Sequence, residues 1–185
     1  METRRRLFIG IALPDCIRDD IARRTAPLRE SGVVKWVDPT NFHLTLRFFG
    51  DTPSEMVSTM RKELRAAVLP VPAFEAALAG VGAFPTTKRP RVIWIGVSKG
   101  EESLSRLGRE MEAAARRLGF PPELRPFSSH LTIGRVRSFS GLFRGLEEFD
   151  LKPTETFWVR GCTLFESTLT PKGAIYQVVE NFPLN

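Results

Sequence analysis

One short pattern occurs twice in this 185-residue chain. The sequence His-Leu-Thr followed by Leu or Ile begins at His43 and begins again 87 residues later at His130, and these are the only two histidines. A second landmark, an Ile-Gly-aliphatic run, is centred on Gly10 and again on Gly96, which are 86 residues apart. Two spacings that agree within one residue indicate an internal duplication. The chain is thereby limited to folds that can be built from two related halves.

Hydrophobic periodicity predicts the same order of elements in each half. Apolar or alternating runs predict strands at residues 7–13, 33–37, 42–49, 74–83, 92–97, 129–136, 156–167 and 174–182. Apolar residues at helical spacing predict helices at 15–29, 54–68 and 101–118, and a weaker one at 139–149. Residues 85–90, with a proline at each end, are expected to form a connecting loop.

Several of the predicted strands alternate apolar and polar residues, as antiparallel strands with one solvated face do. The expected fold class is therefore α+β. We expect one bilobal domain over residues 1–185, with related halves at about 1–84 and 91–185. Antiparallel sheets should form a central cleft, and the helices should pack outside them.

The repeated pattern puts acid–base groups and hydroxyls on one surface. Because successive strand side chains point to opposite faces, the His and Thr of each copy share a face, and the aliphatic residues between them enter the core. If a pseudo-twofold axis relates the halves, then His43, Thr45, His130 and Thr132 face a common cleft. Histidine, whose ordinary pKa is about 6.5, can act as base or as acid at neutral pH.

That constellation suits a phosphodiester. The threonine hydroxyls can donate hydrogen bonds to non-bridging phosphate oxygens, where the transition state holds charge. Two histidines without clustered carboxylates make a poor site for a divalent metal, so neither a metal nor a cofactor is expected. A single histidine would more simply be a packed side chain with its hydrogen bonds satisfied. Two histidines at duplicated positions of one motif favour catalysis.

The two motifs and their flanking residues resemble the two-histidine (2H) phosphoesterases. Nearly the whole chain is similar to their bacterial and archaeal RNA 2′,3′-cyclic phosphodiesterase branch, formerly called 2′-5′ RNA ligase. Outside the motifs, the similarity is carried by residues 6–9, 36–42, 47–50 and 89–96, and by Glu166, Ser167, Leu169, Gly173 and Tyr176.

The resemblance implies a bilobal fold with a water-filled cleft, and hydrolysis of RNA 2′,3′-cyclic phosphate ends to 2′-phosphomonoesters. It assigns His43 as proton donor to the departing 3′ oxygen and His130 as acceptor of a proton from the attacking water. Thr45 and Thr132 match the phosphate-holding threonines of the family. The implied partner is RNA that ends in a 2′,3′-cyclic phosphate, with tRNA fragments as one candidate.

Two further residues are candidates for substrate binding. Arg135, five residues after His130, resembles a phosphate-binding arginine of some members. Strict strand alternation would turn Arg135 away from the cleft, so this role requires a bulge or a strand end. Phe48 and Trp36 could stack on a base, although core packing is the commoner role of such residues. Ser129 stands where the family often has proline.

Other activities fit the same residues. RNA ligation is the same transesterification with a 5′-hydroxyl as nucleophile, and hydrolysis ranks first because water is abundant. A non-catalytic RNA-binding module is less favoured, since a degenerate copy has no reason to keep both histidines and both threonines. A phosphodiesterase acting on small cyclic nucleotides or on ADP-ribose cyclic phosphate is a third alternative.

Charge and composition limit the partners and the compartment. The formal net charge of +6 and the pI of about 9.9 favour an anionic ligand such as nucleic acid. The cysteines, Cys16 and Cys162, lie far apart and are interpreted as two buried free thiols. The apolar run 7–13 ends at Pro14 without a cleavage site and is too short to span a bilayer. We therefore expect a cytoplasmic monomer.

Overall fold

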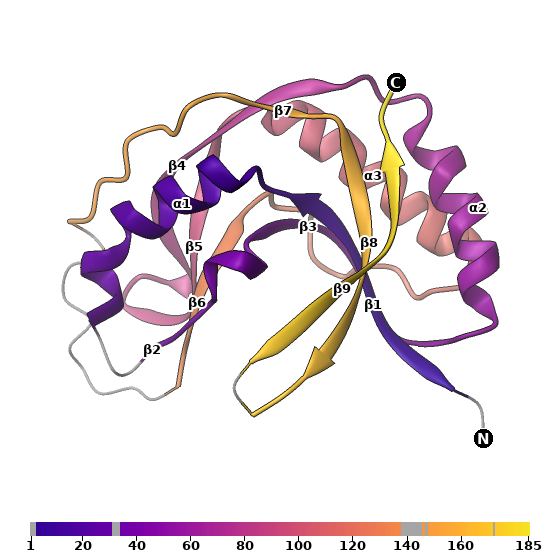
Figure 1. Ribbon diagram of the computed structural model, residues 1–185, viewed down its shortest axis with the longest axis horizontal. Coiled ribbons are helices and arrows are strands. Elements are labelled where there is room, and N and C mark those ends of the chain that lie inside the picture. Colours follow the sequence, from indigo (N-terminus) through magenta and orange to yellow (C-terminus); the bar gives the residue numbers. More distant parts are fainter. Residues whose placement is uncertain (1–2, 31–33, 138–145, 147, 172) are drawn as a thin grey trace.

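The computed structural model describes residues 3–30, 34–137, 146, 148–171 and 173–185 (Figure 1). Its helices are α1 (Asp15–Arg24), α2 (Met56–Val68) and α3 (Glu101–Arg117), with short 3-10 helices η1 (Ala26–Glu30) and η2 (Pro39–Asn41). Its strands are β1 (Arg4–Ala12), β2 (Val34–Trp36), β3 (His43–Pro53), β4 (Phe74–Thr86), β5 (Arg89–Lys99), β6 (Leu131–Val136), β7 (Phe157–Val159), β8 (Gly161–Leu169) and β9 (Ala174–Pro183).

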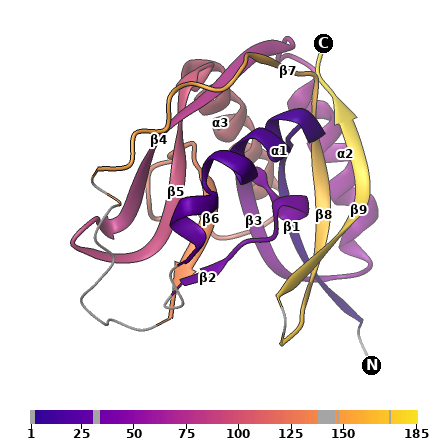
Figure 2. The same ribbon diagram turned by 60° about the vertical axis from the view of Figure 1, so that its left-hand side comes forward.

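The strands form a strongly curved antiparallel sheet. Their order is β7-β4-β5-β6-β3-β1-β8-β9, and β2 pairs with the end of β6 on the edge that faces β3. Figures 1 and 2 show the sheet arching around its middle strands, with the β8–β9 hairpin projecting beyond β1. The expected α+β class with antiparallel strands is confirmed.

The helices cover this sheet with amphipathic faces. Helices α2 and α3 pack against each other and against β3, and α2 also contacts β9. Helix α1 buries Ile17 and Ile21, and α3 buries Leu104, Leu107 and Met111. None of the helices in the described part of the chain is long and apolar enough to cross a membrane.

A row of four apolar residues crosses the centre of the sheet. Ile11 lies opposite Leu44, Leu44 opposite Leu131, and Leu131 opposite Ile95. All four side chains are at most 2% exposed and belong to one continuous core that includes both halves. Burying such side chains stabilises a protein by roughly 1.5–3 kcal/mol each, so this row holds the four central strands in register.

The strand pairing gives a different alignment of the two halves from the one that the sequence landmarks gave. Ile11 and Ile95 are both paired with the leucine that follows a motif histidine, and they are 84 residues apart. The alignment of Gly10 with Gly96 is therefore wrong by two residues. The loops and bulges between the landmarks differ in length, so equal spacing along the chain does not mark equivalent positions.

Three predicted elements differ from the structure. The helix expected at 15–29 ends at Arg24, where the Thr25 hydroxyl donates to the carbonyl oxygen of Ile21. Pro27, which cannot continue the helical hydrogen bonds, then lies in η1. The strand expected at 156–167 is two strands, because β7 pairs with β4 whereas β8 pairs with β1.

The loop expected at 85–90 is also wrong. Strands β4 and β5 continue as a hairpin, with Pro85 opposite Pro90 and Thr86 opposite Arg89. The two prolines are tolerated because they lie at a register irregularity, beyond the part of β5 that pairs with β6. The helix expected at 139–149 falls mainly on residues 138–145 and 147, which lie outside the described residues.

The two cysteines are free but differ in burial. Cys162 is buried as expected, and burial raises the pKa of its thiol to about 12. Cys16 is exposed on α1, so the expectation that both thiols are buried is wrong for this one. Its position on the solvent side of a helix follows from the face that Ile17 and Ile21 occupy.

Candidate active site

The two histidine motifs meet in the middle of the sheet. Strands β3 and β6 pair antiparallel with Leu44 opposite Leu131. In this antiparallel register, His43 comes opposite Thr132, and Thr45 comes opposite His130. The two strands are thus neighbours in one sheet rather than opposite walls of a cleft. Their polar side chains share the face opposite the buried leucines.

Hydrogen bonds fix the ring of His43 in one orientation. Its Nδ1 lies 2.7 Å from the carbonyl oxygen of Asn41, which can only accept, so Nδ1 carries a proton. Its Nε2 lies 3.0 Å from the Thr45 hydroxyl. The ring also contacts Phe8, 4.8 Å away between centroids, and Tyr176, which is nearly perpendicular to it and 5.2 Å away. The side available for chemistry is therefore Nε2.

The His130 ring is oriented by the same kind of hydrogen bond, from Nδ1 to a backbone carbonyl. Its Nδ1 lies 2.8 Å from the carbonyl oxygen of Ser128, two residues earlier, as the Asn41 carbonyl is two residues before His43. The edge of Phe84 meets its ring at 5.1 Å between centroids. In the neutral form, this tautomer leaves Nε2 with a free lone pair and makes it a proton acceptor.

The surroundings lower the pKa of both imidazoles. For His43, burial lowers the pKa most, the bond to the Asn41 carbonyl partly offsets it, and the positive charges of His130 and Arg135 lower it further. For His130, burial again dominates, the bond to the Ser128 carbonyl raises the pKa, and Arg135 lowers it. The two rings and the guanidinium are thus close enough for their charges to interact.

A bulge brings Arg135 to the same face as the motif. Consecutive residues of β5 lie opposite Thr132 and Gly134, so Ile133 has no partner in that pairing. This extra residue shifts the alternation by one and puts Thr132 and Arg135 on one side of the strand. The structure therefore contains the bulge that a role for Arg135 in the cleft requires.

Phe48 occupies the matching place in the first motif. Strand β3 has its own irregularity at Leu46, and Phe48 follows His43 by five residues, as Arg135 follows His130. Phe48 is 40% exposed, and the guanidinium of Arg6 lies 4.6 Å from the centre of its ring. Core packing was the wrong expectation for Phe48. It holds for Trp36, which is half-buried against the core.

A large open groove extends from the motifs over the second half of the molecule. Its volume is about 1500 Å³. Thr45, Phe48, His130, Thr132 and Arg135 all line it; His43 does not, but its Nε2 is hydrogen-bonded to Thr45, which does. Across the ranges that the structure describes, no three His, Cys, Asp or Glu side chains gather as a metal site.

A buried arginine connects the first motif to the segment that leads into the second. Arg47 on β3 is 6% exposed, and its guanidinium donates to the Pro121 carbonyl oxygen at 2.6 Å and to Glu123 at 2.7 Å. Its Nε lies 2.8 Å from a carboxylate oxygen of Glu112 on α3. Burial raises the pKa of Glu112. Hydrogen bonds from Arg116 and from the backbone N–H of Glu123, together with the charge of Arg47, outweigh this effect and lower the pKa overall.

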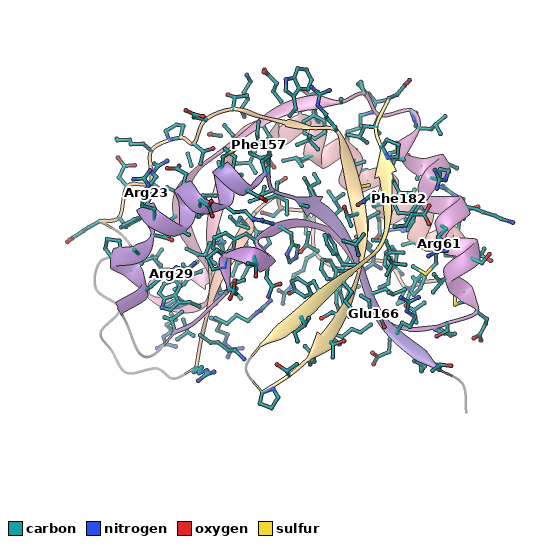
Figure 3. The ribbon with its side chains drawn as sticks, viewed as in Figure 1. Arg23, Arg29, Arg61, Phe157, Glu166 and Phe182 are labelled. Carbon is teal, nitrogen blue, oxygen red and sulfur yellow. The ribbon has the colours of Figure 1, made fainter. Side chains whose placement is uncertain are left out.

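The β8–β9 hairpin closes the first motif from the other side. The Asn41 side-chain amide donates to the Ala174 carbonyl oxygen at 2.8 Å, while the Asn41 carbonyl holds His43. Glu166 on β8, labelled in Figure 3, accepts from Arg5 of the neighbouring strand β1 at 2.6 Å. Tyr176, which contacts the His43 ring, lies in β9 opposite Ser167 of β8.

Several residues at this site had no clear signal in the sequence. Tyr176 was noted only as a flanking match, although it is the only tyrosine of the chain. Phe84, which contacts the His130 ring, lay between the strand expected at 74–83 and the loop expected at 85–90. Arg47 looked like an ordinary flanking residue, because its ion-pair partners and the Pro121 carbonyl lie more than 60 residues away in sequence.

The chain was compared with known families and with curated relatives. The family model described as LigT like phosphoesterase matches residues 11–94 and, a second time, residues 95–176. The RNA 2′,3′-cyclic phosphodiesterase of Archaeoglobus fulgidus is 35% identical over 178 residues, which are 96% of this chain and 99% of that relative. The protein of the same name from Aquifex aeolicus is 34% identical, with 97% of each chain covered.

Solved structures give the same fold. A crystal structure of a protein from Thermus thermophilus superposes with a TM-score of 0.82 at 28% identity, covering 97% of each chain. E. coli LigT complexed with NADP+ superposes with a TM-score of 0.81 at 25% identity, covering 98% of each chain. The curved antiparallel sheet with its three helices is thus an architecture shared along the whole length.

Proposed function

The chain belongs to the family of LigT-like phosphoesterases, and on that basis we propose that it hydrolyses 2′,3′-cyclic phosphates at RNA ends to 2′-phosphomonoesters. Curated relatives named for this activity are 32–35% identical over nearly the full length. The observation that carries the proposal is the pair of imidazoles, each with Nδ1 held by a backbone carbonyl, beside two threonine hydroxyls.

His130 acts as the general base in this proposal. Its Nδ1 proton is held by the Ser128 carbonyl, so the Nε2 lone pair is available to an attacking water in the groove. Its lowered pKa keeps the ring neutral near pH 7. As the water oxygen forms a bond to phosphorus, its proton passes to Nε2.

His43 acts as the general acid on the opposite side of the phosphorus. The P–O3′ bond breaks, and a proton from Nε2 passes to the 3′ oxygen, which leaves a 3′-hydroxyl and a 2′-phosphate. Burial alone disfavours the protonated ring. The negative charge of the bound phosphate favours the protonated form and so offsets the effect of burial.

Thr45, Thr132 and Arg135 stabilise the charge on the non-bridging oxygens in this scheme. All three line the groove beside His130. Hydrogen-bond donors fixed in advance stabilise developing negative charge without reorganising during the reaction. Arg135 adds a full positive charge, which also lowers the pKa of both imidazoles.

The organisation of the chain and its partners form part of the same proposal. A single bilobal domain with halves at about 1–84 and 91–185 agrees with the meeting of the two motifs at Leu44 and Leu131. The substrate is RNA with a 2′,3′-cyclic phosphate end, and tRNA fragments are one candidate source. A monomeric state and a cytoplasmic location stay predictions from the sequence.

A single assay tests the proposal. The protein is incubated with a short RNA that ends in a 2′,3′-cyclic phosphate, in the presence of EDTA, and the product isomer is identified by digestion with a phosphomonoesterase and chromatography. The expected product is the 2′-phosphate, formed at an unchanged rate in EDTA. A 3′-phosphate product, a joined RNA, or activity that returns only with a divalent metal would contradict the scheme.

A further inference from the structure

We infer that the groove beside His130 binds the RNA chain that precedes the cyclic phosphate, so that oligonucleotide ends are hydrolysed in preference to cyclic mononucleotides. This inference rests on the proposed function and adds a second binding region to it. The evidence lies in the charge, the arrangement and the size of the groove.

The groove has a large excess of positive charge. Among the residues that the structure describes, seven arginines but only two glutamates line it. Arg47 and Arg116 are already paired with those glutamates, Glu112 and Glu123. The other five have exposed side chains without an ion pair to any described residue: Arg89, Arg91, Arg109, Arg125 and Arg135. Unpaired guanidiniums around a common space are a site for a polyanion.

The five arginines come from separate elements that surround one space. Arg109 projects from α3, on the face that also carries Glu112 and Arg116. Arg89 and Arg91 lie near the start of β5, on either side of Pro90, and both line the groove. Arg125 lies on the segment between α3 and β6. The positive charges therefore reach the groove from several elements rather than from one loop.

The groove is also larger than one nucleotide needs. Pockets for drug-sized ligands measure about 300–1,000 Å³, whereas this groove measures about 1500 Å³. Aromatic rings stand among the arginines. Phe127 packs on Gly108, where an added methyl carbon would lie 2.9 Å from its ring, and Phe84 lies against His130. Cationic side chains with interspersed aromatic rings are the usual means of binding single-stranded nucleic acid.

The test compares two substrates with the same terminal nucleotide. One is 2′,3′-cyclic AMP, and the other is a pentanucleotide that ends in adenosine 2′,3′-cyclic phosphate. The ratio of their kcat/KM values is measured for the intact chain and for R109Q/R125Q at two salt concentrations. We expect the intact chain to favour the pentanucleotide by at least about 10-fold at low salt. The double variant should lose most of that preference, with a salt slope shallower by roughly 1.4 for two lost contacts.

A matched variant separates location from total charge. R106Q/R160Q also removes two exposed arginines, one from α3, but neither lines the groove. It should keep the substrate ratio. An equal loss in both double variants, or an intact chain that treats the two substrates alike, overturns the inference. Absence of hydrolysis of either substrate would instead refute the proposed function. If R109Q/R125Q keeps the substrate ratio but joins the cyclic-phosphate RNA to an added 5′-hydroxyl RNA more slowly, then the groove binds that second RNA. This result would also overturn the inference.

Discussion

Leu44 lies opposite Leu131, and this pair joins the strands that carry the two histidine motifs. Both side chains are at most 1% exposed, so the contact is part of the core. The polar neighbours of the two leucines are thereby held on one face at fixed separation. In the proposed mechanism, acid and base act in one concerted transfer, and this shared scaffold makes their contributions interdependent.

Removal of both histidines should cost much less than the product of the single losses. H43A and H130A should each lower kcat/KM by about 10²–10⁴-fold, the usual effect of a positioned general acid or base. H43A/H130A should be little worse than either single variant, because one partner without the other cannot complete the transfer. Single-turnover rates on an RNA cyclic phosphate measure all three. Fully multiplicative losses would show that the histidines act independently.

The pH dependence of kcat/KM should have its maximum on the acid side of neutrality. The active form has one protonated and one neutral imidazole, so the maximum lies between the two pKa values of the free enzyme. Both pKa values are lowered from 6.5, so we expect the maximum below about pH 6.5. R135M removes a positive charge that lowers both, and should move the maximum to higher pH while lowering the rate. A maximum above pH 7 in the intact chain would contradict this account.

The two half-buried histidines should also make the fold less stable in acid. Their folded-state pKa values lie below the unfolded value of about 6.5, so the unfolded chain binds protons first as the pH falls. The free energy of unfolding should therefore fall below about pH 6.5 and level off once the folded rings protonate. Urea unfolding at pH 7.5, 6.0 and 5.0 measures this, and H43Q/H130Q should show a smaller fall over the same range.

Exposed Phe48 should contribute to substrate binding more than to stability. Stacking of a base on an aromatic ring is worth about 1–3 kcal/mol, so F48A should raise KM for RNA by roughly 5- to 100-fold. The melting temperature should change little, because the ring is 40% exposed. F49A is the control for a structural role. Phe49 is only 8% exposed, so its removal should lower the melting temperature. An F48A protein with lower stability and normal KM would return Phe48 to a structural role.

The sequence was most informative where the chemistry depends on local spacing. The paired motifs led to His43, Thr45, His130 and Thr132, because strand alternation is a local property and both copies obey it. The expectation that Phe48 packs in the core was wrong, because its outward position depends on an irregularity in the pairing of β3 with β1. A bulge is decided by the partner strand, which the sequence of one segment does not specify.

Long-range contacts explain the other differences. Arg47 is buried because residues of α3 and the following segment surround it, and no local pattern distinguishes it from a solvated arginine. Pro85 and Pro90 indicated a loop, yet β4 and β5 continue through them, because the two prolines lie at a register irregularity where β5 has no second partner strand. The two-residue error in aligning the halves arose in the same way, from bulges that alter the spacing between landmarks.

Arg47 should influence catalysis through the segment that precedes His130. It holds the Pro121 carbonyl and Glu123, and this segment continues to Ser128, whose carbonyl orients the His130 ring. R47M should lower kcat by at least about 10-fold. It should also lower the free energy of unfolding by about 3 kcal/mol, because a buried ion pair loses one partner. R47K keeps the charge but cannot reach all the acceptors, so its kcat and its free energy of unfolding should lie between those of the intact chain and those of R47M.

The pH profile separates a positioning role from a merely structural one. The bond to the Ser128 carbonyl raises the pKa of His130, so its loss in R47M should move the limb that belongs to His130 to lower pH. R117M is the matched control, because Arg117 on α3 makes an exposed ion pair with Glu63 that should contribute at most about 1 kcal/mol. R117M should leave kcat and the profile as they are. If R47M loses stability but keeps kcat and the profile of the intact chain, Arg47 only holds the fold together and does not position the base.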